Sequence, residues 1–322
     1  MVPALPDKEC IVGLSPMDDI TDMPFRQLCK ERGADLLITE FIASEALNRD
    51  AEKSLRKMRF DNAQRPLGIQ IFGADEYELL RCLDVVEQAG PDFIDINWGC
   101  PVRKVAGKGA GSGILQDVPK MLRITAALVA RAKLPVTVKT RLAYDTRSAT
   151  VADFAEALQD TGIAMLTIHG RTKTQMYSGQ ADWTLIGAVK NNPRIHIPIL
   201  GNGDIGTAAQ AVEAHRRYGV DGILIGRAAI GNPWIFEQCR RAFCGLGERQ
   251  ISVAERVEEC RRHLHLSAGF KGEKTAVFEM RKHYGSYFAG LYNFKPFRLR
   301  LVSLASLAEL DALLDEIAAH YD

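Results

Sequence analysis

The sequence lacks the features of membrane, secreted and zinc-bound proteins. None of its apolar runs approaches the roughly 18 residues that a membrane-spanning helix needs, and the first ten residues, MVPALPDKEC, are too short and too charged for a secretory signal. The seven cysteines form no CxxC pair and no zinc-like spacing, and their odd number argues against a disulfide framework. We therefore expect a cytoplasmic protein with reduced cysteines, no metal and no membrane contact.

Aromatic residues are also scarce, at 7%, and net charge is almost absent, since 41 Lys and Arg oppose 40 Asp and Glu. The bulk charge of +1 therefore indicates neither a nucleic-acid nor a membrane partner. A chain of 322 residues with 47% hydrophobic residues is folded rather than disordered or collagen-like. It is long enough for a barrel of about 250 residues with a small second domain, or for two medium domains.

Short apolar runs alternate with helical patterns from residue 11 to about 235. The runs are continuous and rich in β-branched residues, which is typical of parallel strands buried on both faces. Eight strands are predicted, at 11–17, 35–41, 67–72, 93–98, 135–140, 165–170, 197–203 and 221–226. Helices are predicted between them, for example at 75–89, 118–132, 150–161 and 206–218. Eight strand–helix units favour an α/β protein with a (β/α)8 TIM barrel. The alternative, an open doubly wound sheet, usually has fewer strands and a glycine-rich turn after the first.

After about residue 240 strand-like runs disappear, and the patterns predict helices at 252–268, 272–290 and 304–320. We expect a barrel over 1–244 and a helical domain over 245–322. Charge is segregated in this second region. Nine basic residues between 261 and 300 oppose two acids: Arg261, Arg262, Lys271, Lys274, Arg281, Lys282, Lys295, Arg298 and Arg300 against Glu273 and Glu279.

Polar side chains end several predicted strands, where TIM barrels carry their chemistry. Gln70, Asn97, Lys139 and His169 lie within otherwise apolar runs at the ends of the third to sixth strands. Any one of them alone is more often a hydrogen-bonded core residue, because burying it without a partner costs about 1–3 kcal/mol. Four at equivalent positions indicate a polar ligand at the barrel mouth.

Two glycine-rich segments, GNGDIG (201–206) and IGRAAIGNPW (225–234), follow the seventh and eighth strands. Glycine backbones beside helix starts, together with Arg227, are typical of a phosphate site at this place in the barrel. Cys100 lies in a Gly-Cys-Pro turn after the fourth strand. A thiol there is a candidate nucleophile or general acid, whereas we interpret the other cysteines as packing residues.

These residues resemble the flavin-dependent tRNA-dihydrouridine synthases, most closely the bacterial B-type subgroup. The resemblance rests on motifs in family order from about residue 15 to 240: SPMDDITDMPFR (15–26), TEF (39–41), QIFG (70–73), DINWGCPVRKV (95–105), GAGSGIL (109–115), VKTRL (138–142), IHGRT (168–172), GNGDI (201–205) and IGRAAIGNPWIF (225–236). It continues more weakly through MRKHYGSYFAGL (280–291). The combination of Asn-x-Gly-Cys-Pro with HGRT is the most specific part.

The resemblance implies FMN in the barrel mouth, NADPH as the reductant and reduction of the uracil 5,6 double bond of tRNA uridines. Cys100 would give a proton to carbon 5 of the uracil while hydride from the flavin reaches carbon 6. The implied cofactor-binding residues are Pro16, Met17, Asp18, Gln70, Lys139, His169, Asn202, Gly203, Asp204, Gly226 and Arg227. The implied substrate-binding residues are Asn97, Arg141 and Arg171 in the barrel and Arg281 and Lys282 in the basic region.

A target base must leave its stack to reach a barrel mouth, so the enzyme also needs a surface that holds the tRNA. The basic region fits such a surface because aromatic residues are interleaved with it: Tyr284, Tyr287, Phe288, Tyr292, Phe294 and Phe297. The alternative is a packed helix with a solvated basic face. We expect a monomer.

The sequence departs from the usual motif at Asp18 and Asp19, at Trp98 and at Ala106. Two other functions remain open from the residues alone. One is a flavin barrel acting on a free pyrimidine, similar to dihydroorotate dehydrogenase, which would not need the basic region. The other is a non-catalytic RNA-binding protein on a retired barrel, in which loss of Cys100, Lys139 or the glycine segments would be expected.

Overall fold

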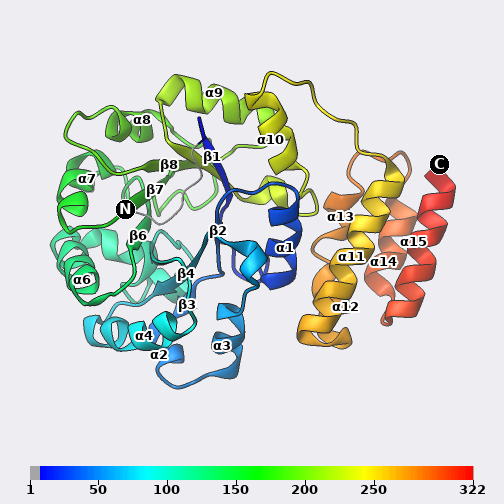
Figure 1. The fold of residues 1–322 in the computed structure, drawn as a ribbon, viewed down its shortest axis with the longest axis horizontal. Helices are drawn as coiled ribbons and strands as arrows, with labels where there is room; N and C mark the ends of the chain where they lie inside the picture. The colour runs from blue at the N-terminus through cyan, green and yellow to red at the C-terminus, as the bar shows by residue number, and fades with distance from the viewer. Residues whose placement is uncertain (1–7, 322) are drawn as a thin grey trace.

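A closed sheet of parallel strands forms the centre of the computed structural model, which describes residues 8–321 (Figure 1). Its order is β1-β9-β8-β7-β6-β5-β4-β2, and β3 also pairs with β4. The strands are β1 (Ile11–Leu14), β2 (Leu37–Ile38), β3 (Ile42–Ala43), β4 (Leu67–Phe72), β5 (Phe93–Trp98), β6 (Val136–Arg141), β7 (Met165–His169), β8 (Ile199–Asn202) and β9 (Gly222–Ile225). Two backbone hydrogen bonds, from Leu14 N to Leu36 O and from Asp35 N to Val12 O, join β1 to the β2 segment and close the barrel. The predicted (β/α)8 barrel is confirmed.

Helices surround this sheet (Figure 1). They are α1 (Met23–Glu31), α2 (Ser44–Leu47), α3 (Glu52–Met58), α4 (Glu76–Gln88), α5 (Arg103–Ala106), α6 (Val118–Arg131), α7 (Val151–Asp160), α8 (Thr184–Lys190), α9 (Ala208–Tyr218) and α10 (Ile235–Phe243). The side chains of Asp75, Asp117 and Thr207 accept hydrogen bonds from backbone N–H groups of the first turns of α4, α6 and α9. Such N-caps satisfy donors that have no partner within the helix, which explains why the chain turns into helices at these points.

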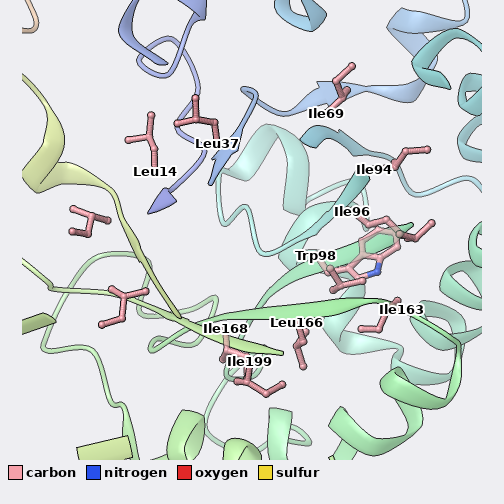
Figure 2. Close-up of a cluster of buried hydrophobic side chains, with 14 of the residues drawn as sticks. Leu14, Leu37, Ile69, Ile94, Ile96, Trp98, Ile163, Leu166, Ile168 and Ile199 are labelled. Atoms are coloured by element: carbon pink, nitrogen blue, oxygen red, sulfur yellow. The ribbon is translucent and has the colours of Figure 1, made fainter. Parts of the chain in front are cut away.

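Buried hydrophobic side chains, most of them aliphatic residues of the strands, form the core of the barrel, and Figure 2 shows part of this cluster. Trp98, one of the departures from the family motif, is fully buried in this core. Its Nε1 donates a hydrogen bond of 3.0 Å to Thr125 Oγ1 of α6. The indole therefore packs against the helix layer, not at the barrel mouth.

A second hydrophobic cluster holds the C-terminal helices together. These are α11 (Val253–Lys271), α12 (Glu273–Met280), α13 (Tyr284–Tyr287), α14 (Lys295–Ser303) and α15 (Leu307–Tyr321). No helix in residues 8–321 is both long and apolar enough to cross a membrane.

One sequence expectation in this region is wrong, and one helix has no counterpart among the predicted ones. The single helix predicted over 272–290 is broken after Met280, where the chain turns so that His283 packs against His263 of α11. The helix α14 was not predicted, because its exposed residues include three basic side chains and it has little amphipathic pattern.

Helix α1 of the barrel is the platform on which the C-terminal helices pack (Figure 1). Arg32, which caps α1, donates two hydrogen bonds to the buried Glu259 of α11, of 3.0 and 2.8 Å. The Phe25 and His263 rings stack with their centroids 5.3 Å apart. These contacts join the two hydrophobic clusters. The domain boundary between residues 244 and 245 stays a prediction.

Candidate active site

The C-terminal ends of the barrel strands open into a cavity of about 1110 Å³. Thirteen of the predicted site residues line it: Pro16, Met17, Asp18, Asn97, Cys100, Lys139, Arg141, His169, Asn202, Gly203, Asp204, Gly226 and Arg227. The strand register explains this, because it pairs Asn97 with Lys139 and His169 with both Arg141 and Asn202 across neighbouring strands. Of the other four, Gln70 and Arg171 lie behind the cavity wall and Arg281 and Lys282 lie in the C-terminal helices.

Gln70 is fully buried and belongs to a chain of hydrogen bonds that ends at Cys100. Its Nε2 donates to Asp95 at 2.6 Å, and its Oε1 accepts from Asn97 Nδ2 at 2.8 Å. Asn97 Oδ1 in turn accepts the backbone N–H groups of Gly99 and Cys100 at 2.9 and 2.7 Å. Three side chains thus hold the backbone that carries the Cys100 thiol.

The GAGSG segment supports the same loop from the other side. Ser112 donates to the Cys100 carbonyl from both its backbone N, at 3.0 Å, and its hydroxyl, at 2.9 Å. Gly111 has φ of +51°, and a Cβ there would lie 2.8 Å from the Cys100 carbonyl oxygen. Only glycine therefore allows the backbone to approach Cys100 so closely.

Burial raises the pKa of the Cys100 thiol above its ordinary value. A raised pKa keeps the thiol protonated at neutral pH, so Cys100 fits a proton donor better than a thiolate nucleophile. Among the other cysteines, Cys10, Cys29, Cys82, Cys239 and Cys260 are buried, as expected for packing residues. Cys244 departs from that expectation because it is exposed.

Cationic side chains dominate the deep part of the cavity. Lys139 Nζ donates to Asn202 Oδ1 at 3.1 Å, and burial together with Arg141 lowers the Lys139 pKa to about 8. Arg141 donates to the carbonyls of Gly99, Thr172 and Met176, so it links the Cys100 loop to the loop after β7.

His169 lies beside these cations and is neutral. Burial first, and then Lys139 and Arg141, lower its pKa to about 2. Its buried Nδ1 has no hydrogen-bond partner among the described residues. A polar atom in this state is ready to bond a ligand of the cavity, because leaving it unpaired costs free energy.

The glycine segments after β8 and β9 form the other end of the cavity. Asp204 accepts hydrogen bonds from Arg171, from Arg227 and from Ala181 N. Burial disfavours its charge, but the Arg171 bonds outweigh burial and hold the Asp204 pKa below its ordinary value. Arg171 thus acts on Asp204, while Arg227 lies at the rim, 57% exposed in its side chain.

Two of the cavity residues that the sequence reasoning missed carry charge or an aromatic ring beside predicted ones, Lys57 and Tyr177. Lys57 of α3 forms ion pairs with Asp18 and Glu40. Burial opposes the Lys57 charge, but Glu40 and Asp18 outweigh it and raise its pKa. Tyr177, in the loop after β7, lies beneath the guanidinium groups of Arg141 and Arg227 at 5.6 and 5.4 Å from its ring centroid. Neither residue lies in a motif at the end of a strand, so no local sequence pattern predicted that it lines the cavity.

The aromatic residues that alternate with basic ones in the C-terminal sequence were expected on the RNA-holding surface, and for most of them this expectation is wrong. Five of the six aromatic residues, Tyr284, Tyr287, Phe288, Phe294 and Phe297, are buried in the second hydrophobic cluster, and only Tyr292 is exposed. Several cations of the region are also engaged: Arg261 with Asp311 and Asp315, Arg262 with Glu31, Lys271 with Asp22 and Glu279, and Arg300 with Glu316. Lys274, Arg281, Lys282, Lys295 and Arg298 form no ion pair within residues 8–321.

Comparison with known proteins identifies the family. The sequence profile described as Dihydrouridine synthase (Dus) matches residues 13–321. The chain belongs to the dihydrouridine synthase family. The enzyme class expected from the sequence, a flavin-dependent oxidoreductase of this family, is thereby confirmed, and the match includes the C-terminal helices as well as the barrel.

Curated relatives are similar in sequence to this chain over most of their length. A protein named probable tRNA-dihydrouridine synthase from Rickettsia conorii is 37% identical over 88% of this chain and 86% of its own. A protein named tRNA-dihydrouridine synthase B from Pseudomonas aeruginosa is 36% identical over 88% and 86%. The resemblance to the B-type subgroup is therefore also seen in a comparison over most of both chains.

Solved structures support the fold. Histamine dehydrogenase from Rhizobium sp. 4-9 aligns with a TM-score of 0.56 and 12% identity over 80% of this chain and 49% of its own. A morphinone reductase variant in complex with tetrahydroNAD aligns with a TM-score of 0.52 and 11% identity over 72% and 86%. At such low identity these likenesses concern the fold alone.

Proposed function

We propose that this dihydrouridine synthase binds FMN at the barrel mouth and reduces uridines of tRNA to dihydrouridine with NADPH as the reductant. The observation that carries the proposal is that Cys100, Lys139 and both glycine segments line one cavity. Small-molecule pockets usually span roughly 300–1,000 Å³. The cavity of about 1110 Å³ is large enough to suggest two ligands, a flavin and a flipped nucleobase.

The residues present fit a flavin mononucleotide. Gly203 and Gly206 line the cavity before α9, and Arg227 projects from the segment after β9, so glycine backbone and a cation lie at one place in the cavity, as at a phosphate site. The N–H groups of Gly206 and Thr207 are bonded to Gln210 Oε1, which would have to release them to a phosphate. Lys139 supplies a cation deep in the cavity for a negatively charged ring edge. The unpartnered His169 Nδ1 offers a further polar contact. Direct contact of Gln70 and Arg171 with flavin or substrate stays a prediction, because both side chains lie behind the wall.

Bound in this cavity and reduced, FMN would supply the hydride for carbon 6 of the uracil. The Cys100 thiol gives its proton to carbon 5, and its raised pKa keeps that proton available at neutral pH. Asn97 and Arg141 hold the loop that carries the thiol and also line the cavity. Their amide and guanidinium donors suit the uracil oxygens, where negative charge develops.

Cys100→Ala tests this proposal. Purified enzyme reconstituted with FMN is given NADPH and tRNA lacking dihydrouridine, and the product is measured by mass spectrometry of nucleosides. We expect Cys100→Ala to bind flavin and to be reduced by NADPH like the wild type, but to lose at least about 100-fold in dihydrouridine formation, the lower range for removing a general acid.

The exposed Cys244 gives a matched control. Cys244→Ala should retain full product formation, because this thiol lies outside the cavity. Undiminished product from Cys100→Ala would remove Cys100 as the proton donor. A wild-type protein that takes up no FMN would overturn the cofactor assignment.

A further inference from the structure

One large aromatic side chain of the C-terminal helices is exposed beside unpaired cations. Phe278 of α12 is 66% exposed, although the other apolar residues of this helix, Ala276, Val277 and Met280, are buried. The Arg281 guanidinium lies over its ring, 4.7 Å from the centroid. Single exposed apolar side chains are common on protein surfaces. Phe278 differs from the others on these helices because its exposed ring lies beside cations that have no acidic partner among the described residues.

Charge around Phe278 is positive. Lys274 lies one helical turn before it, Lys282 lies in the turn that follows α12, and both are exposed. Neither they nor Arg281 form an ion pair within residues 8–321. The two acids of α12 are engaged elsewhere, Glu279 with Lys271 and Glu273 with the backbone N of Leu307.

This positive strip leads to the cavity. Lys282 Nζ donates a hydrogen bond of 3.0 Å to the backbone oxygen of Asp19, whose neighbour Asp18 lines the cavity. A small cleft beside α12 is lined by four cations and four acids: Lys53, Arg56, Lys57 and Lys271, and Asp19, Asp22, Glu40 and Glu279. The positive charge available to an RNA chain is therefore that of the strip itself, while the cleft beside it has mixed charge.

We propose that Phe278 stacks on an unpaired base of the RNA whose target uridine enters the cavity, while Lys274 and Lys282 contact the adjacent phosphates. This inference rests on the proposed function. Proteins that hold single-stranded nucleic acid combine cations for the backbone with aromatic rings on which bases stack. A purely electrostatic surface would not need the phenylalanine, and an apolar protein partner would not be matched by three unpaired cations.

Salt dependence separates stacking from charge. Phe278→Ala should weaken tRNA binding about tenfold, with an unchanged slope of log affinity against log salt, because stacking releases no counterions. Lys274→Ala should reduce that slope by about 0.7 to 0.9. Phe278→Tyr should bind within about twofold of the wild type, since it keeps the ring.

Leu246→Ala is the matched control. Leu246 is also exposed, at 55%, but it follows α10, whose Arg240 contacts Asp35 at the opposite end of the barrel. The Leu246→Ala variant should bind tRNA with the affinity of the wild type. Equal affinity of Phe278→Ala and wild type, or a changed slope for Phe278→Ala, would overturn the stacking.

Phe278→Trp gives a direct readout, because Trp98, Trp183 and Trp234 are all buried. Its added fluorescence should be quenched by tRNA but not by inorganic polyphosphate at the same charge concentration. Quenching by both would mean that the surface recognises charge alone, and quenching by neither would mean that no base reaches Phe278.

Failure of the inference and failure of the proposed function are distinguishable. If the wild type forms dihydrouridine and Phe278→Ala does so with an unchanged KM for tRNA, only the inference fails. If the wild type forms none, the proposed function fails. Flavin reduction by NADPH should be the same in Phe278→Ala and wild type, because Phe278 lies outside the cavity.

Discussion

Cys100 owes its position to residues that do not touch the reacting atoms. Asn97 holds its backbone N–H, Gln70 holds Asn97, and Asp95 holds Gln70, so the conformation of the loop depends on a buried carboxylate three hydrogen bonds away. Burial raises the Asp95 pKa to about 6, against the hydrogen bonds from Gln70 and Thr137. At neutral pH the carboxylate is ionised and accepts both bonds, which fixes the orientation of the Gln70 amide.

Asp95→Asn should therefore impair turnover without loss of RNA binding. An amide at this position can donate as well as accept, so Gln70 is free to turn and release Asn97. We expect about a tenfold lower kcat with an unchanged KM for tRNA, and a changed rate of Cys100 alkylation by iodoacetamide.

Thr137→Val is the control for Asp95→Asn, because it removes the other bond to Asp95 but leaves the Gln70–Asn97 link intact. It should affect kcat and alkylation less. An Asp95→Asn enzyme with wild-type kcat and alkylation would show that the chain of bonds does not position the thiol.

At the scale of elements, α11 carries both the interface with the barrel and a weak point. Its residues Glu259 and His263 face α1, whereas Gly269 near its end is exposed and has open space around its Cα. Glycine in a helix leaves the unfolded chain more freedom than alanine does and so destabilises the folded state.

Gly269→Ala should raise the free energy of unfolding by about 0.5–1 kcal/mol. Gly111→Ala is the opposite case, because its positive φ and its contact with Cys100 should make the same replacement destabilising and lower product formation. Urea unfolding of both variants measures the difference. A destabilised Gly269→Ala would mean that this end of α11 is not a free helical surface.

At the scale of the whole molecule, the two hydrophobic clusters meet at buried histidines. The His263 and His283 rings are 4.6 Å apart, and Phe25 of the barrel lies against both. Burial lowers the pKa of His263 to about 3, and burial with His263 lowers that of His283 further below its ordinary value. Both rings are therefore neutral in the folded protein.

This pair makes stability depend on pH. A histidine in the unfolded chain takes up a proton near pH 6.5, whereas His263 and His283 in the folded protein do not. The free energy of unfolding is therefore highest above pH 6.5 and decreases as the pH falls below it, because protonation stabilises only the unfolded state. Each ring should contribute a loss of about 1.4 kcal/mol between pH 7.5 and 5.5.

His263→Gln should remove the part of this pH-dependent loss of stability that comes from one ring. The measurement is the difference between the urea midpoints at pH 7.5 and 5.5, which should be smaller in the variant than in the wild type. His196→Gln, at an exposed histidine, should leave the pH dependence as in the wild type. An unchanged pH dependence in His263→Gln would show that the ring is already solvated and charged in the folded protein.

The sequence by itself determined the barrel and most of its mouth. Buried parallel strands have a local signature, and residues at strand ends converge because all the strands run in one direction. Thirteen predicted site residues reached the cavity for this reason. The family motifs indicated the same barrel and most of the same site residues.

Only the tertiary structure decided which polar and aromatic side chains are free to meet a ligand. Gln70 is bound by Asp95 and Asn97, and Arg171 by Asp204. In the C-terminal helices Tyr284 is buried while Phe278 is exposed. Both belong to one apolar and basic stretch, and the difference comes from how α11 to α15 pack, since partners distant in sequence leave no local pattern.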